Sequence, residues 1–232
     1  MKKLFKNVLS LLVVVLFLAG ISETGWATPF QNGDFETGDF TGWSGEIGYY
    51  DNGNLVGTTV DPDSSDYFNL FHTPNPDYLW TAEISLDDTY YHNALYQDFT
   101  LDALNGPGWT MDITFWISWS PTNPDWDGIS VTLEDAGGNQ SINLLDGVSY
   151  DDLTTGISIT QDITSFAQSY GGQDVELAFT IWDWDFNTDD VLIIDNISFQ
   201  QRAPAPVPEP STVVLLGFGL AGIVGLRKKR VR

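Results

Sequence analysis

The feature that most constrains the fold is an alternation of apolar and polar residues in the segment 110–119. Its sequence, TMDITFWISW, has an apolar residue at every second position, which is the period of a half-buried β-strand and not of a helix. The residues of that apolar face are Met111, Ile113, Phe115, Ile117 and Trp119. Further strands are expected at Leu95–Leu101, Ile129–Leu133, Ile157–Ile159, Val175–Ile181 and Val191–Phe199. The chain is therefore predicted to build its core from β-sheets.

Turn-forming residues separate these strands, as in Asp135–Asn139, DAGGN. One short helix is expected at Asp162–Ser169, with Asp162 or Thr164 as its N-cap. Many short strands between Gly, Asn, Asp and Pro loops indicate an all-β fold, an antiparallel β-sandwich, over residues 28–202. We find no repeat of roughly 20–50 residues, which argues against a solenoid or a propeller.

The charge distribution separates the two ends of the chain from its middle. Of nine Lys and Arg residues, three precede position 7 and five follow position 226, so Arg202 alone lies between. Residues 28–207 set that one positive charge against 30 acidic side chains, a formal charge of −29. Such a surface repels nucleic acid and anionic lipid, and it favours cations and neutral ligands. The chain has no cysteine, so disulfides and thiolate metal sites are excluded.

The first 27 residues have the layout of a secretory signal peptide. The basic start MKKLFK precedes the apolar run Val8–Ile21 and the small-x-small cleavage site Gly25–Ala27. Cleavage after Ala27 would leave Thr28 as the first residue of the mature chain. We therefore expect the middle of the chain to be exported from the cytoplasm of a bacterium.

The C-terminal end, after an Ala/Pro linker at 203–206, combines three unlike pieces. Pro208, Glu209 and Pro210 stiffen the entry, and residues 212–226 form an uncharged apolar run that contains four glycines. The basic end comprises Arg227, Lys228, Lys229, Arg230 and Arg232. An apolar helix of this length spans roughly 22 Å, short for a hydrocarbon core of about 30 Å. A temporary membrane anchor with its basic flank in the cytoplasm is predicted.

These three pieces, in this order, resemble the PEP-CTERM sorting signal of exported proteins of Gram-negative bacteria. The resemblance covers 207–232, about a tenth of the chain. It implies processing near the Pro-Glu-Pro motif by an exosortase-type membrane protease. It also implies transport to the cell surface or an exopolysaccharide matrix. The alternative is an ordinary single-span anchor.

Two segments of the middle resemble galactose-binding-like carbohydrate-binding modules. Asn32–Gly38, NGDFETG, followed by Gly42-Trp43, is similar to their opening, and Asp195–Ser198, DNIS, to their closing strand. The resemblance implies a jelly-roll β-sandwich whose first and last strands lie together and hold a structural calcium ion. Glu36 and Asp195 would be side-chain ligands, with Asp34 as a further candidate, and carbonyl oxygens would complete the shell. The alternative is that Glu36 caps a turn and Asp195 is exposed.

Exposed aromatic rings are the expected sugar-binding groups. Two Asp-Trp-Asp segments, 125–127 and 183–185, place a Trp between acids that demand water, which makes the ring hard to bury. The candidates are Trp126, Trp184, Trp182, Trp80 and Tyr78. The alternative is that these rings cover an open end of the core. Trp43, Trp116 and Trp119 are expected to be structural.

The segment 183–190, DWDFNTDD, is a second candidate cation site. Asp183, Asp185, Asn187, Asp189 and Asp190 supply oxygens within eight residues. An EF-hand is excluded, because Thr188 stands where that loop requires Gly and no flanking helices are predicted.

Catalytic motifs find little support. His72 and His92 are the only histidines, and neither lies in a metalloprotease-like or triad-like setting. With 30 acids in the middle, any carboxylate pair for glycoside hydrolysis can be drawn, so none is informative. The sequence thus predicts a non-catalytic protein that binds polysaccharide or belongs to an exopolysaccharide layer. The alternatives are a purely structural, calcium-stiffened matrix protein and a glycan-active hydrolase or lyase.

Overall fold

The computed structural model describes residues 29–51, 54–72, 80–87, 89–125, 127–184 and 190–205. The predicted signal peptide and the whole sorting signal lie outside these ranges. So do Tyr78, Trp126 and residues 185–189. The predictions made for them are therefore not addressed by the fold.

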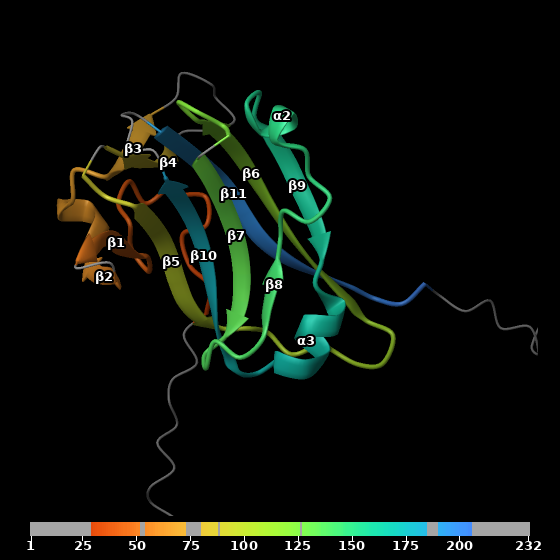
Figure 1. Ribbon diagram of the computed structural model, residues 1–232. Helices are drawn as coiled ribbons and strands as arrows, with labels where there is room; N and C mark the ends of the chain where they lie inside the picture. The colour runs from red at the N-terminus through yellow and green to blue at the C-terminus, as the bar shows by residue number, and fades with distance from the viewer. Residues whose placement is uncertain are drawn as a thin grey trace, which may run out of the picture.

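Two antiparallel sheets stack face to face (Figure 1). The six-stranded sheet has the order β2 (Asn54–Val60), β1 (Ser44–Asp51), β5 (His92–Thr100), β10 (Asp174–Asp183), β7 (Asp127–Asp135), β8 (Ser141–Asn143). The five-stranded sheet has the order β3 (Phe68–His72), β4 (Trp80–Leu86), β11 (Asp190–Arg202), β6 (Thr110–Ser120), β9 (Ile157–Asp162). From β4 onward the chain alternates between the sheets, apart from the β7–β8 pair. The predicted jelly-roll β-sandwich is confirmed.

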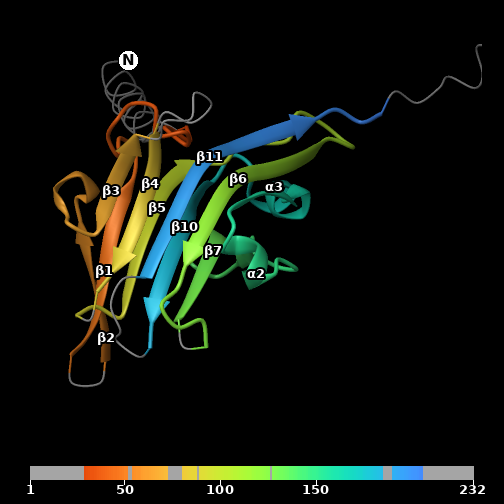
Figure 2. The same ribbon diagram turned by 90° about the horizontal axis from the view of Figure 1, so that it is seen from above.

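Within the described ranges, three short helices accompany the sheets. They are η1 (Pro62–Ser64), α2 (Tyr150–Leu153) and α3 (Thr164–Tyr170). Figures 1 and 2 show α2 and α3 on one side of the sandwich, next to β6 and β9. The predicted helix begins two residues later than expected, because β9 continues to Asp162. Asp162 still accepts a hydrogen bond from the backbone N–H of Thr164 through Oδ1, at 2.8 Å.

The core lies between the sheets and follows the alternation seen in the sequence. All five apolar-face residues of 110–119 are buried, and so are the alternating residues of β7 and β10. Trp43 and Trp119 are buried as expected, whereas Trp116 lies on the outward face of β6 and is only half-buried. The pairing of β6 with β11 shifts register between Asp195 and Ser198, which marks a bulge next to one candidate site.

Five strands were not predicted: the short β8, and β1 to β4, which all lie before position 87. Gly45 and Gly48 interrupt β1, and Gly57 interrupts β2, so neither has the apolar alternation that identifies a strand. β3 is short and mostly exposed. β4 buries Ala82, Ile84 and Leu86, a weaker pattern than in β6.

Candidate functional site

The outward face of the six-stranded sheet carries a row of residues with three glycines. Going across the strands, Gly57 pairs with Gly48, Gly48 with His92, His92 with Trp182, and Trp182 with Gly128. Five neighbouring strands, β2, β1, β5, β10 and β7, each contribute one residue. Because three of the five have no side chain, the two rings can lie over the backbone of the adjacent strands.

The distances show that both rings lie over the backbone of an adjacent strand. A Cβ on Gly48 would lie 2.0 Å from Cε1 of the His92 ring, and a Cβ on Gly128 would lie 2.3 Å from Nε1 of Trp182. The carboxyl group of Glu46 occupies the corresponding place over Gly57, at 2.6 Å from such a Cβ. We call Trp182, His92 and the glycines beneath them the ring row.

Glu46 fixes the imidazole of the ring row. Its Oε1 lies 2.9 Å from Nε2 of His92, and the two residues come from adjacent strands, β1 and β5. The sequence reading treated His92 as an ordinary strand residue. The glycines that face it became visible only once the register was known.

Trp184 extends this surface beyond the end of β10. It is 53% exposed and stands two residues after Trp182, directly past Asp183, the last residue of β10. The ring of Tyr91 packs edge-on against it, with ring centroids 4.6 Å apart and an interplanar angle of 84°. This contact orients the indole while leaving more than half of the side chain accessible.

The five predicted sugar-binding aromatic residues do not lie in one place. Trp182 and Trp184 lie together, as described above. Trp80 is at the start of β4 in the other sheet, where it packs against the core and against the ring of His72, 5.3 Å away. Trp80 therefore belongs to a different part of the molecule. Trp126 and Tyr78 lie outside the described residues.

Behind the ring row lies a group of buried carboxylates. Asp127 precedes Gly128, Asp183 separates Trp182 from Trp184, and Asp190 begins β11. They are 8%, 0% and 0% exposed, and one carboxylate oxygen from each lies within 4.8 Å of those from the other two. Among the residues that the structure describes, this is the one such group found. We call it the aspartate triad.

Backbone donors support two members of the triad. The N–H of Asn123 donates to Oδ2 of Asp127 at 2.6 Å, and the N–H of Thr122 donates to Oδ1 of Asp190 at 2.5 Å. Arg202, the one Lys or Arg within the described ranges, pairs with Asp112 at 2.5 Å. Charges about 4–5 Å apart repel by roughly 3–4 kcal/mol per pair at an effective dielectric constant of 20. A bound cation would offset this repulsion, and the hard oxygens of the triad suit calcium.

The second candidate metal site joins the opening segment to the last strand. The N–H of Ile197 donates to the carbonyl oxygen of Gly33 at 2.8 Å, so the first and last segments lie together as expected. Asp195, only 2% exposed, accepts two hydrogen bonds from Asn196, at 2.6 and 3.1 Å. The reading of Asp195 as an exposed strand residue is therefore wrong.

Glu36 and Asp34 are close enough to Asp195 to affect its ionisation. The pKa of Asp195 is raised to about 7: burial is the largest cause, the backbone hydrogen bond from Asn196 acts against it, and the carboxylates of Glu36 and Asp34 add smaller upward contributions. Oε1 of Glu36 accepts from the backbone N–H of Trp80 at 3.2 Å, while Oδ1 of Asp34 accepts from the N–H of Glu36 at 3.3 Å. Calcium binding here stays a prediction, because the carboxylates of Asp34, Glu36 and Asp195 do not converge within 4.8 Å as those of the aspartate triad do.

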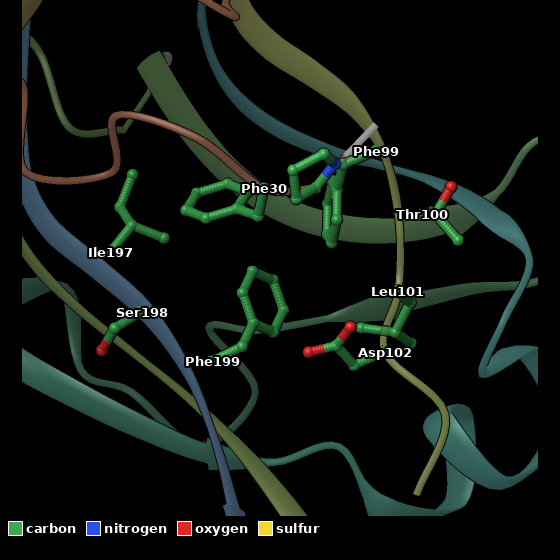
Figure 3. A pocket seen from close by; sticks show the side chains of 9 residues that line it. Phe30, Phe99, Thr100, Leu101, Asp102, Ile197, Ser198 and Phe199 are labelled. Atoms are coloured by element: carbon green, nitrogen blue, oxygen red, sulfur yellow. The ribbon is translucent and has the colours of Figure 1, made fainter. Parts of the chain in front are cut away.

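A cavity of about 310 Å³ opens between the N-terminal segment, β5 and β11. The rings of Phe30, Phe99 and Phe199 turn toward one another within it (Figure 3). Each pair of ring centroids is 5.1 Å apart. Because the rings partly cover one another, they fasten the N-terminal segment to the sandwich and offer a sugar less flat surface than Trp182 and Trp184 do.

The C-terminal end matches a known protein-sorting motif. Residues 206–230 fit the sequence model of the PEP-CTERM protein-sorting motif, so the chain carries this motif where it was expected. No helix within the described ranges is long and apolar enough to cross a membrane, and the apolar run 212–226 lies outside them. A search of curated proteins found no match.

Solved structures with a similar fold have different roles. The carbohydrate-binding module TmCBM61, in complex with β-1,4-galactotriose, is 15% identical, with a TM-score of 0.48 over 75% of this chain and 99% of that one. A Stig cyclase from Fischerella is 18% identical, with a TM-score of 0.42 over 77% of this chain and 98% of that one. The enzymatically active domain of bacteriophage CBA120 tailspike protein 4 is 14% identical. Its TM-score is 0.44, over 76% of this chain but only 22% of that one. Function therefore has to be argued from the chain's own residues.

Proposed function

We propose that this protein is an exported, non-catalytic polysaccharide-binding protein. The observation that carries the proposal is the ring row, in which the indole of Trp182 lies over Gly128, together with the exposed Trp184 that follows it. Flat rings on a rigid sheet present an apolar face with little entropy to lose on binding. The apolar face of a pyranose ring is the complementary surface, and the carboxylates and hydroxyls nearby supply hydrogen-bond partners.

The two ends of the chain account for the export and sorting of the protein in this proposal. The signal peptide directs export through the inner membrane of a Gram-negative bacterium. The apolar run 212–226 holds the protein in the membrane for a time, until an exosortase-type protease cuts near Pro208–Pro210. The released domain then resides at the cell surface or in an extracellular polysaccharide matrix. The motif match at residues 206–230 supports this route.

Calcium is proposed as a structural ligand at two places. The first combines Glu36 and Asp195, with Asp34 as a further ligand. The second is the aspartate triad, which contains Asp183 and Asp190 of the predicted loop together with Asp127, which sequence reading did not connect to that loop. Calcium takes six to eight oxygens, so backbone carbonyls or water would complete both shells.

The aspartate triad offers the hydrolase alternative no reachable acid pair. Asp183 and Asp190 are completely buried, so a glycosidic bond cannot approach the triad without opening the end of the sandwich. The purely structural alternative differs in a single property, because such a protein has no saturable affinity for any glycan.

A glycan-binding experiment separates these functions. The full chain would be titrated against a panel of neutral, amine-bearing and acidic oligosaccharides, with calcium and with EDTA. The variant Trp184→Ala should weaken binding at least tenfold while its melting temperature stays close to that of the wild type. Trp182→Ala should weaken binding as well. Its matched control is Trp116→Ala, which removes an indole lying over Gly156 on the opposite sheet.

Three outcomes decide the proposal. Saturable binding that is lost in the Trp182 and Trp184 variants and kept in the Trp116 variant supports it. Absence of binding across the whole panel favours the purely structural protein. Release of reducing sugar from any polysaccharide of the panel would reveal a hydrolase.

A further inference from the structure

Three acidic side chains lie directly opposite one another on the face that carries the ring row. Glu176 of β10 pairs with Asp98 of β5 on one side and with Glu134 of β7 on the other. Like charges in directly opposed positions destabilise a sheet. We call these three residues the acid row.

The carboxylates of this face interact with one another. Burial raises the pKa of Glu176, and the charges of Asp98, Glu134 and Glu46 raise it further. No lysine or arginine of the described residues lies on this face, because Arg202 ends β11 in the other sheet and is paired with Asp112. The acid row therefore lacks a cationic partner in the described protein.

Mostly small side chains occupy the space between the two rows. Ala94, Thr180 and Ser130 form the row next to the rings, and Tyr96, Ala178 and Thr132 form the row next to the acids. Trp182 lies six positions after Glu176 along β10, which corresponds to roughly 20 Å. A sugar chain of a few units can thus touch the rings at one end and the carboxylates at the other.

Resting on the proposed polysaccharide-binding function, we propose that this face selects amine-bearing sugar chains. One sugar stacks on Trp182, and the ammonium groups of others pair with Asp98, Glu176 and Glu134. Uncharged chains bind through the rings alone, and uronic-acid or sulfated chains are repelled. The acid row thus adds selectivity for charged sugars to a surface whose rings alone would bind uncharged glycans as well.

The test compares two hexamers of the same backbone in titrations of the full chain. The chitosan hexamer carries amines, and the chitin hexamer carries the same groups N-acetylated and uncharged. The triple variant Asp98→Asn, Glu176→Gln, Glu134→Gln should weaken chitosan binding roughly tenfold, as expected for three ion pairs at the protein surface. Its affinity for the chitin hexamer should be unchanged.

General attraction of a polycation to an acidic protein needs its own control. The variant Asp146→Asn, Asp151→Asn, Asp152→Asn removes three exposed acids around α2 and changes the net charge equally. It should bind both hexamers as the wild type does. Raising the salt from 50 mM to 500 mM should reduce the preference of the wild type for chitosan, because exposed charges are screened.

The outcomes distinguish this inference from the function on which it rests. Equal loss of chitosan affinity in the two triple variants overturns the inference, since the attraction is then unspecific. No binding of chitosan, with Trp182-dependent binding of other glycans, also overturns it but leaves the proposed function standing. No binding of any glycan overturns both.

Discussion

Gly33 and Ile197 touch so closely that no side chain fits between them. The Ile197 N–H donates to the Gly33 carbonyl oxygen at 2.8 Å, and a Cβ on Gly33 would lie 2.2 Å from the Ile197 carbonyl oxygen. The contact occurs where β11 bulges between Asp195 and Ser198. The opening segment is thereby held against the strand that supplies one proposed calcium ligand.

The substitution Gly33→Ala should therefore destabilise the domain by about 1–3 kcal/mol, the usual cost of overpacking a rigid site. The obstacle is backbone, which cannot rotate away. Urea unfolding followed by tryptophan fluorescence measures the change. Gly106→Ala is the matched control, because its Cβ would meet Trp109 at an ordinary 3.6 Å. Equal stability of the two variants would contradict the argument.

The fold could be predicted for strands in which only one of the two faces points toward the core. β6, β7 and β10 alternate apolar and polar residues because the other side faces water, and a period of two identifies them directly. β1 and β2 escaped prediction, since Gly48 and Gly57 occupy positions where a polar or apolar side chain would have marked the period. Those same glycines make room for His92 and Glu46.

The site was predictable only in part, because cross-strand neighbours depend on register. Trp184 was proposed from the acids on both sides of it, and Trp182 was proposed beside it in the same short segment; their sugar binding stays a prediction. His92 was not, because its partners Gly48 and Glu46 lie on another strand. Likewise, Asp127 is more than 50 residues from Asp183 in sequence, and only the pairing of β7 with β10 places them opposite each other.

Filling the space beneath the ring row should impair binding more than folding. In Gly128→Ala the new Cβ would collide with the Trp182 indole at 2.3 Å, and the side chain can swing off the sheet to relieve the clash. We expect a loss of glycan affinity of at least fivefold with a small change in melting temperature. Gly106→Ala again serves as control. Unchanged affinity would show that the position of the indole over Gly128 is irrelevant.

Calcium should raise the melting temperature of the full chain, because a ligand that binds only the folded state stabilises it by about 2.7 kcal/mol at 100 times its Kd. Glu36→Ala or Asp195→Ala should remove the gain due to the first site. Asp183→Asn should remove the gain due to the triad. Differential scanning fluorimetry with calcium and with EDTA measures both. A calcium response that none of these variants reduces would refute both assignments.

Without metal, a substitution in the aspartate triad should change the melting temperature in the opposite direction. In EDTA, Asp127→Asn removes one of three carboxylates that share a buried space, so the variant should melt at a higher temperature than the wild type at pH 8. With saturating calcium the order should reverse, because the variant has lost a ligand. The same order under both conditions would show that no cation binds at the triad.

Glu176 should make stability depend on pH. Its pKa is raised from the ordinary 4.5 by burial and then by Asp98, Glu134 and Glu46, so the folded state holds the proton more tightly than the unfolded state. The stabilisation from this proton is complete below about pH 4.5 and is lost as the pH rises through the raised pKa. In EDTA, Glu176→Gln should therefore melt at a higher temperature than the wild type at pH 7–8 and at nearly the same temperature at pH 4. Asp151→Asn, which also removes one charge but outside the acid row, should give a smaller gain at pH 7–8. An equal gain in both variants would mean that net charge alone, and not the opposition of three acids across neighbouring strands, sets the effect.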